Sequence, residues 1–141
     1  MDLKYFDWAK HQALMRPNKV AIKDYYSGEQ LTYLELEKRA LKIAAYFQKK
    51  NIGNKDRVAL LSRNNSIFFE LQFACAKRGV ILVPLNWRLT APELSFILND
   101  CDPKLLIFDS PFKGIVSSLN NCCLLYTYTS PRDLNRSRIP S

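Results

Sequence analysis

The sequence contains few of the residues from which compact catalytic centres are built. Its four glycines are all isolated, so they form no glycine-rich loop of the kind that surrounds a phosphate group. It has a single histidine, His11, and a histidine that acts as a general base needs both a partner and a pocket. Because His11 lies in a weakly amphipathic N-terminal segment, we interpret it as an ordinary surface residue.

The cysteines lack the spacing of a metal site. Cys75, Cys101, Cys122 and Cys123 include no C-x-x-C pair, and a disulfide framework would require a secreted protein. The N-terminus is mixed in charge and has no apolar core of a secretory signal. No apolar run approaches the roughly 18 residues that span a bilayer. We therefore expect reduced thiols, no metal site, no transmembrane segment and a cytoplasmic location.

The charge distribution argues against a nucleic-acid partner. The formal net charge is +8, but Lys and Arg are interspersed with acidic residues and never form a run of five like charges. No nucleic-acid recognition motif is present. An ordinary solvated surface explains this charge, so no nucleic-acid partner is expected.

Apolar strands and helical segments alternate through the middle of the chain. Strands are predicted at 57–61, 80–83 and 105–108, with helices at 66–77 and 91–100 between them. Strands joined through helices in this way are parallel. The apolar run at 80–83 is expected to be covered on both faces, and Pro84 to end it because proline cannot donate to a sheet ladder.

Upstream of this alternation the sequence predicts a helix, a small β-hairpin and a second helix. The first helix covers 2–16 and stops at Pro17. Val20–Ile22 and Gln30–Thr32 form the hairpin. The apolar face of the first helix is expected to consist of Leu3, Phe6, Ala13 and Leu14. The predicted fold class is therefore α/β, with a partial open parallel sheet (βαβαβ) preceded by an N-terminal helix, a small β-hairpin and a helix.

Two glutamates are explained by helix capping. Thr32 and Thr90 each precede a glutamate by three residues, which is the spacing of a capping box. Glu35 and Glu93 are therefore interpreted as caps and not as a catalytic pair of carboxylates. The helix that follows Thr32 carries one apolar stripe, Leu36, Ala40, Ile43, Ala44 and Phe47. The helix at 66–77 is expected to bury Phe69, Phe73, Ala74 and Ala76.

Trp87 and Arg88 follow the carboxyl end of a predicted strand, where open α/β sheets often bind ligands. A tryptophan at such a place is more often a packing residue, and we interpret Trp87 in that way. The residues alone therefore predict a parallel α/β domain without a complete active site.

Several motifs, in order, resemble those of adenylate-forming enzymes over about residues 5–109. Leu31-Thr32-Tyr33-Leu34-Glu35-Leu36 resembles the L-T-Y-x-E-L motif near the start of that family, and 17–22 matches its opening. The stretch 58–64 is similar to the strand and turn that follow, and 76–90 to a second common motif. P-L-N-W-R-L at 84–89, followed by E-L-x-F-I-L-N-D, looks most like acyl-CoA synthetases of the fatty-acid type.

This resemblance implies an ATP-dependent acyl-CoA ligase. In the family, a carboxylate attacks the α-phosphate of ATP, and the acyl-adenylate then transfers its acyl group to coenzyme A. The resemblance implies ATP, Mg²⁺ and coenzyme A for a full-length member, with a small-molecule carboxylic acid as substrate. Mg²⁺ and a lysine would offset the charge on the phosphates.

The departures from the family pattern limit what carries over. The sequence lacks five features of the family: the glycine-rich phosphate loop ending in Pro-Lys, the aromatic-Gly-x-Thr-Glu segment, the T-G-D motif, the hinge and the C-terminal lysine. Thr129–Arg132 superficially resembles the phosphate loop but lacks its glycines and its lysine. No catalytic, cofactor-binding or metal-binding residue of the family therefore maps onto this chain. We interpret 1–114 as a truncated N-terminal part of a synthetase large domain, inactive by itself and binding none of these cofactors. Whether the chain is itself an enzyme stays open.

Residues 115–141 are expected to form an irregular tail that does not continue the parallel sheet. No helical period is present after Asn120. Cys123–Thr127 and Ser130–Asp133 resemble translated sequencing-adaptor sequence, so we predict that this tail is not native to the synthetase. Two alternatives to a synthetase fragment remain: a stand-alone, non-catalytic binding module of the same fold, and a small enzyme of another type. The second is disfavoured because the sequence lacks a nucleophile and base.

Overall fold

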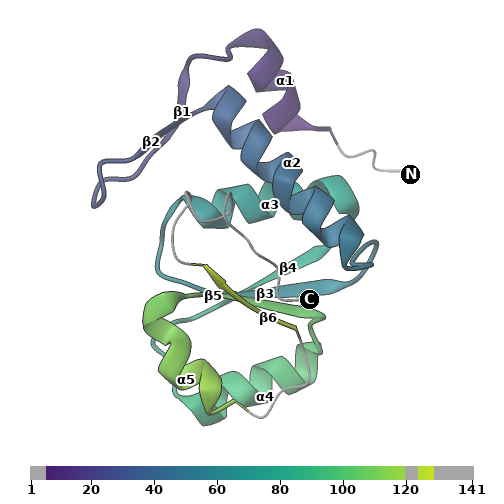
Figure 1. Ribbon diagram of the computed structural model, residues 1–141, viewed down its shortest axis with the longest axis vertical. Helices are drawn as coiled ribbons and strands as arrows, with labels where there is room; N and C mark the ends of the chain where they lie inside the picture. The colour runs from purple at the N-terminus through teal and green to yellow at the C-terminus, as the bar shows by residue number, and fades with distance from the viewer. Residues whose placement is uncertain (1–5, 120–123, 129–141) are drawn as a thin grey trace. The chain divides into compact units, whose positions relative to one another are not determined.

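The computed structural model describes residues 6–119 and 124–128 and has the α/β class expected from the sequence (Figure 1). The chain divides into two compact units, which are described separately. The first unit contains 1–56 and 65–81, and the second contains 57–64 and 82–141.

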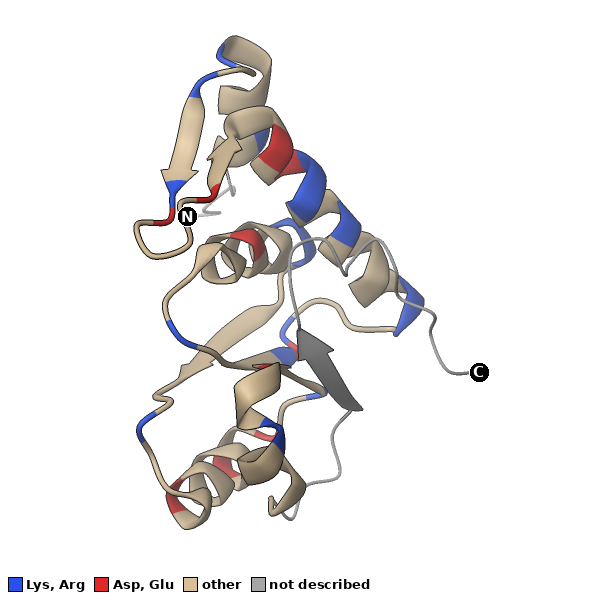
Figure 2. Cartoon of the chain, turned by 60° about the vertical axis from the view of Figure 1, so that its left-hand side comes forward, with Lys and Arg blue, Asp and Glu red and all other residues tan. Residues whose placement is uncertain are grey.

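The first unit combines helices with an antiparallel hairpin. Its elements are α1 (Trp8–Met15), β1 (Val20–Lys23), β2 (Gln30–Thr32), α2 (Tyr33–Lys49) and α3 (Ser66–Arg78). Strands β1 and β2 pair antiparallel, which confirms the predicted hairpin. Lysines and arginines lie along α2 and are scattered over the other elements, with acidic residues among them (Figure 2).

Helix α2 begins and packs as its sequence predicts. Glu35 N–H donates to Thr32 Oγ1 over 3.3 Å, and Thr32 N–H donates to the Glu35 carboxylate over 2.8 Å, so the capping box is complete. The whole predicted apolar stripe of this helix is buried, namely Leu36, Ala40, Ile43, Ala44 and Phe47. Two orphan amides at the helix start are thus satisfied, and one face supplies the core of the first unit.

The predicted orientation of α3 is wrong. Of the four residues expected inside, only Ala74 is buried, whereas Phe73 and Ala76 are half-buried and Phe69 is 44% exposed. The apolar part of the buried face consists of Ile67, Leu71, Ala74 and Cys75. Apolar residues occur nearly all round this helix, so their spacing does not select one face. Glu70 lies on the buried face, which a pattern of apolar residues cannot reveal.

Helix α1 is shorter than predicted and packs through smaller residues. Its buried residues are Ala9 and Ala13, while Phe6 and Leu14 are exposed. Leu3 and the first part of the predicted helix lie outside the described residues. Small side chains allow a short helix to approach a neighbour closely. The predicted apolar face is therefore confirmed at Ala13 and wrong at Phe6 and Leu14.

The second unit contains the parallel sheet. Its elements are β3 (Arg57–Leu61), β4 (Ile81–Leu85, whose first residue belongs to the first unit), α4 (Ala91–Cys101), β5 (Leu105–Asp109), the 3₁₀ turn η1 (Ser110–Phe112), α5 (Lys113–Ser117) and β6 (Leu124–Tyr128). The strand order is β4-β3-β5-β6, and β4, β3 and β5 form the predicted three-stranded parallel sheet. Leu61 is opposite Phe108 in the pairing of β3 with β5. The carboxyl ends of these strands therefore meet at one edge of the sheet.

Strand β4 differs from its prediction in two ways. It continues through Pro84 to Leu85, and Ile81 is 49% exposed although 80–83 was expected to be covered on both faces. Both differences have one cause, because β4 is an edge strand of the described sheet. An edge strand tolerates proline, since one side of its backbone has no ladder to form.

The core of the second unit lies between the sheet and helices α4 and α5. Its buried residues are Ala59, Leu61, Leu85, Leu94, Leu98, Leu106, Phe108 and Val116. Trp87 is half-buried and packs against this core, which confirms its interpretation as a packing residue. The α4 capping box is also present, with Thr90 N–H donating to Glu93 over 2.8 Å.

The prediction that nothing after residue 120 continues the sheet is wrong for 124–128. Strand β6 pairs with β5 in parallel, with Leu105 opposite Leu124. The physical reason is that Leu-Leu-Tyr-Thr-Tyr has high β-propensity, and an unpaired edge of β5 would accept such a segment whatever its origin. The predicted irregular tail also included 115–117, but these residues belong to α5, and Val116 is buried in the core. Residues 120–123 and 129–141 lie outside the described residues.

Candidate functional site

Polar side chains collect where β3, β4 and β5 end. Strand β3 is followed by Ser62 and Arg63, strand β4 by Trp87 and Arg88, and strand β5 ends at Asp109. We call these five residues the carboxyl-edge cluster. All belong to the second unit. The cluster forms because the carboxyl ends of parallel strands, and the loops that follow them, lie at the same edge of the sheet. This is the usual ligand-binding edge of open α/β sheets.

Two arginines stack on the tryptophan of the cluster. The guanidinium carbon of Arg63 lies 5.2 Å from the centroid of the Trp87 ring, and that of Arg88 lies 4.9 Å from it. An indole face attracts a cation, and the buried side of Trp87 fixes the ring in place. Both guanidiniums are thereby placed beside the same indole, and both side chains stay exposed.

Local hydrogen bonds fix the loops that carry these arginines. The Arg88 amide donates to Asn86 Oδ1 over 3.0 Å, and the Leu89 amide donates to the Asn86 carbonyl over 3.1 Å. This is the side-chain turn that asparagine commonly forms after a strand. The loop is therefore short and defined, and it leads directly into the capped start of α4.

The chemistry available at this edge is recognition of an anion. A guanidinium presents planar N–H donors that match phosphate and carboxylate groups, and two of them can contact one polyphosphate. No group of three or more His, Cys, Asp or Glu side chains that could hold a metal ion occurs among the described residues. The two arginines therefore fit an anionic group, either a phosphate or a carboxylate.

The other candidate residues do not join the cluster. His11 is exposed and lies in the first unit, 5.3 Å from the ring of Phe6. Glu35 and Glu93 remain in their capping boxes, where backbone hydrogen bonds from Thr32 and Thr90 lower the pKa of each carboxyl. These carboxylates are thus engaged by helix ends and not by each other.

The described cysteines have no feature of a reactive thiol. Burial raises the pKa of the Cys75 thiol to about 12, and it also raises the pKa of Cys101. A thiol with a raised pKa is a poor nucleophile at neutral pH, because the thiolate is the reactive form. Cys122 and Cys123 lie outside the described residues.

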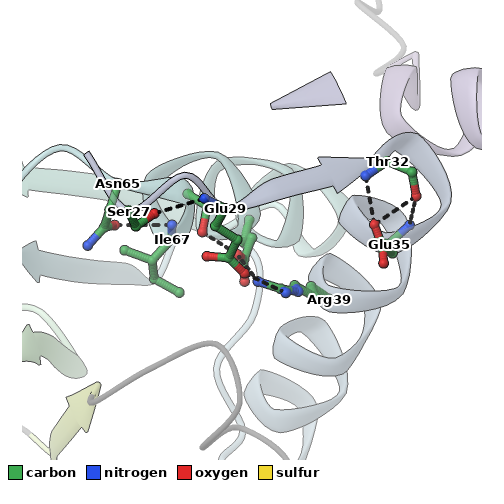
Figure 3. A network of polar contacts seen from close by, with 9 residues as sticks. Ser27, Glu29, Thr32, Glu35, Arg39, Asn65 and Ile67 are labelled. Carbon is green, nitrogen blue, oxygen red and sulfur yellow. Dashed lines mark hydrogen bonds and ion pairs between the residues drawn. The ribbon is translucent and has the colours of Figure 1, made fainter. Parts of the chain in front are cut away.

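Two ion-pair networks in the first unit were not predicted from the sequence. Arg39 contacts Glu29 over 2.9 Å and the buried Glu70 over 3.2 Å, and Figure 3 shows Arg39 reaching Glu29. Lys77 contacts Asp7 over 2.6 Å and Glu37 over 2.8 Å. Each network joins α2 and α3 to a third segment, so we assign both a structural role.

No described helix is both long enough and apolar enough to cross a membrane.

Comparison with known proteins identifies the family. Residues 9–134 match the family described as AMP-binding enzyme. A fatty acid–acyl-carrier-protein ligase from Streptomyces coeruleorubidus is 40% identical over 92 residues, which is 65% of this chain and 18% of that protein. A long-chain-fatty-acid–CoA ligase from Mycobacterium tuberculosis is 33% identical over 118 residues, or 83% of this chain and 24% of that protein.

Solved structures agree with this assignment. The inhibitor-bound N-terminal domain of FACL13 from M. tuberculosis superposes with a TM-score of 0.83 and 29% identity, covering 93% of this chain and 35% of that one. The chain spans about a fifth of the length of the curated relatives, 18% of one and 24% of the other. The extent of the family match, which includes the strands that carry the carboxyl-edge cluster, shows that this chain belongs to the AMP-binding enzyme family.

Proposed function

We propose that this chain is the N-terminal part of a longer, cytoplasmic, ATP-dependent ligase that activates a fatty acid and transfers it to coenzyme A. The observation that carries the proposal is the family match over 9–134. Two relatives named as fatty-acid ligases support the substrate class. One of them is named for coenzyme A and the other for an acyl-carrier protein, so the acceptor is the point that most needs an experiment.

The proposed reaction has two steps. A carboxylate oxygen of the fatty acid attacks the α-phosphorus of ATP, and pyrophosphate leaves. The thiol of the acceptor then attacks the acyl carbon of the adenylate, and AMP leaves. Mg²⁺ supplies charge neutralisation on the phosphates when it is bound. Among the described residues no three or more His, Cys, Asp or Glu side chains gather as a cluster for such an ion.

The carboxyl-edge cluster is the part of this chain that we propose to contact a phosphate-bearing co-substrate. Arg63 and Arg88 are exposed, each contacts the Trp87 indole, and both lie at the sheet edge where α/β folds bind ligands. Both ATP and coenzyme A carry phosphates, so the cluster alone does not select between them. Only kinetics with each co-substrate separates the two.

The test uses the full-length protein that contains this chain. Incubation with a long-chain fatty acid, MgATP and coenzyme A should release pyrophosphate and form acyl-CoA, while an acyl-carrier protein in place of coenzyme A should give no product. Arg88→Ala should raise the KM of one phosphate-bearing co-substrate about tenfold with kcat little changed, since a hydrogen bond to a charged group is lost.

Arg57→Ala is the matched control, because Arg57 lies at the opposite end of β3. Equal KM changes in both variants would count against the cluster. No pyrophosphate release with any fatty acid would count against the ligase.

The chain of 141 residues by itself should not bind MgATP tightly. The reason is that a phosphate site made of two exposed arginines lacks the glycine-rich loop that normally surrounds a triphosphate. Isothermal titration calorimetry measures this directly. A micromolar dissociation constant, about −8 kcal/mol, would contradict the prediction.

A further inference from the structure

The turn between β3 and α3 is held by one carboxylate from a neighbouring strand. Ser62 Oγ lies 2.5 Å and the Arg63 amide 3.3 Å from Oδ2 of Asp109. Leu61 pairs with Phe108, so the next residues, Ser62 and Asp109, lie side by side as β3 and β5 end. The contact is therefore a consequence of the strand register.

Both donors converge on the same oxygen. The Ser62 hydroxyl also lies 2.8 Å from the Arg63 carbonyl, but a hydroxyl has one proton, and a charged acceptor at the shorter distance is favoured. Ser62 is itself buried, which limits competition from water. Asp109 thus fixes the backbone at the residue where the chain leaves the strand.

The fixed residue is Arg63, whose guanidinium lies on Trp87. An arginine side chain has many rotamers. The Arg63 guanidinium can therefore contact the Trp87 ring only when the Arg63 backbone is correctly positioned. Arg88 does not depend on this carboxylate, because its amide is held by Asn86. The backbones of the two arginines are therefore held by different side chains, Arg63 by Asp109 and Arg88 by Asn86.

We propose that Asp109 is a positioning residue that holds Arg63 over Trp87 for contact with the phosphate-bearing co-substrate. The phosphate contact rests on the proposed function, whereas the position of Arg63 does not. The consequence is specific: loss of Asp109 should affect Arg63 and leave Arg88 unchanged.

The first measurement is independent of enzyme activity. The full-length protein is labelled with phenylglyoxal, which modifies arginines, and the sites are followed by peptide mass spectrometry. In Asp109→Ala the rate of phenylglyoxal labelling at Arg63, relative to the rate at Arg88, should rise about threefold. The reason is that the exposed cation–π contact between Arg63 and Trp87 is lost. Asp109→Asn retains an acceptor oxygen and should stay near the original ratio.

Asp100→Asn is the matched control, since it removes an exposed carboxylate from α4 in the same unit. If Asp109→Ala does not yield folded protein, Ser62→Ala keeps the carboxylate, removes the hydroxyl that donates to it, and should raise the same ratio partway. An unchanged ratio in the folded variants would overturn the proposal.

The second measurement is steady-state kinetics with coenzyme A and with MgATP. Asp109→Ala and Arg63→Ala should raise the KM of the same co-substrate by similar factors, with kcat little changed, and the double variant should be no worse than Arg63→Ala. A loss of kcat without a KM change, not rescued by Asp109→Asn, would indicate a merely structural role and overturn the proposal. An altered labelling ratio in a protein with no ligase activity would instead overturn the proposed function and retain the positioning role of Asp109.

Discussion

At the scale of single residues, the least expected group is Glu70. Its side chain is fully buried, with 0% exposure, and one carboxylate oxygen, Oε2, has no hydrogen-bond partner among the described residues. The other oxygen accepts from Ser66 over 3.0 Å and from Arg39 over 3.2 Å. Burial raises the pKa of Glu70, while Arg39 and Ser66 act in the opposite direction. A charge in this place is tolerated because Arg39 compensates it.

Removing Arg39 should therefore be costly. Arg39→Met leaves Glu70 buried without its cation, and we expect a loss of about 3 kcal/mol in local stability at pH 7.5. The pKa of Glu70 is already raised above its ordinary value, so stability that depends on its protonated form is present at low pH and lost as pH rises. The penalty in Arg39→Met should thus be smaller at pH 5 than at pH 7.5.

The measurement is amide hydrogen exchange of α2 and α3 peptides in the full-length protein at both pH values, after correction for the intrinsic rate. Lys38→Met, from the exposed face of the same helix, is the control and should change little. If the loss of local stability in Arg39→Met were larger at pH 5 than at pH 7.5, Arg39 would not be compensating the charge of Glu70.

At the scale of elements, the end of α3 depends on one glycine. Gly79 caps the helix with φ of 67°, in the left-handed region, and a Cβ at this position would lie 2.8 Å from Asn54 Oδ1. The Gly79 carbonyl also accepts from the Lys55 amide over 2.8 Å. Gly79 thus ends α3, and it also contacts the loop that precedes β3.

Gly79→Ala should destabilise the protein by about 1–2 kcal/mol, the cost of a left-handed conformation in a residue with a Cβ. Thermal unfolding of the full-length protein, followed by the exchange of α3 peptides, measures the effect. Gly114→Ala is the control, because Gly114 lies inside α5 and an added Cβ would meet nothing within 4 Å. It should be neutral or slightly stabilising. Equal losses in the two variants would argue against a conformational cause.

At the scale of the whole molecule, the chain belongs to a family whose members are far longer, since it spans 18–24% of the relatives compared here. The origin of residues 115–141 remains a prediction. The match to the family extends to residue 134, and β6 pairs with β5, yet pairing of a β-prone segment with an open strand edge does not depend on common ancestry.

We expect the tail to be foreign to the synthetase. The motifs that can be recognised in the sequence end near residues 109–114, and the tail resembles translated adaptor sequence. Resequencing the source DNA across codons 110–141 should give a different reading frame or continuation after about codon 120. A clean read of Asn120–Ser141 followed by a stop codon would contradict this, and it would favour the stand-alone module.

The sequence by itself determined the local elements and the family. The Thr32 and Thr90 capping boxes, the stripe of α2 and the parallel alternation were all predictable, because capping and periodicity depend on neighbours within a few residues. The order of the motifs also indicated the adenylate-forming family, which the family match confirms.

Only the tertiary structure decided which faces are buried and which distant residues meet. The orientation of α3 was wrong because its buried face includes Glu70, whose compensation by Arg39 comes from another helix. Pro84 was expected to end β4, but its tolerance depends on the strand being at an edge, which is a property of the sheet and not of the strand. Asp109 meets Ser62 and Arg63 through the register of β3 against β5, 46 or 47 residues apart in the chain, and no local pattern encodes that contact.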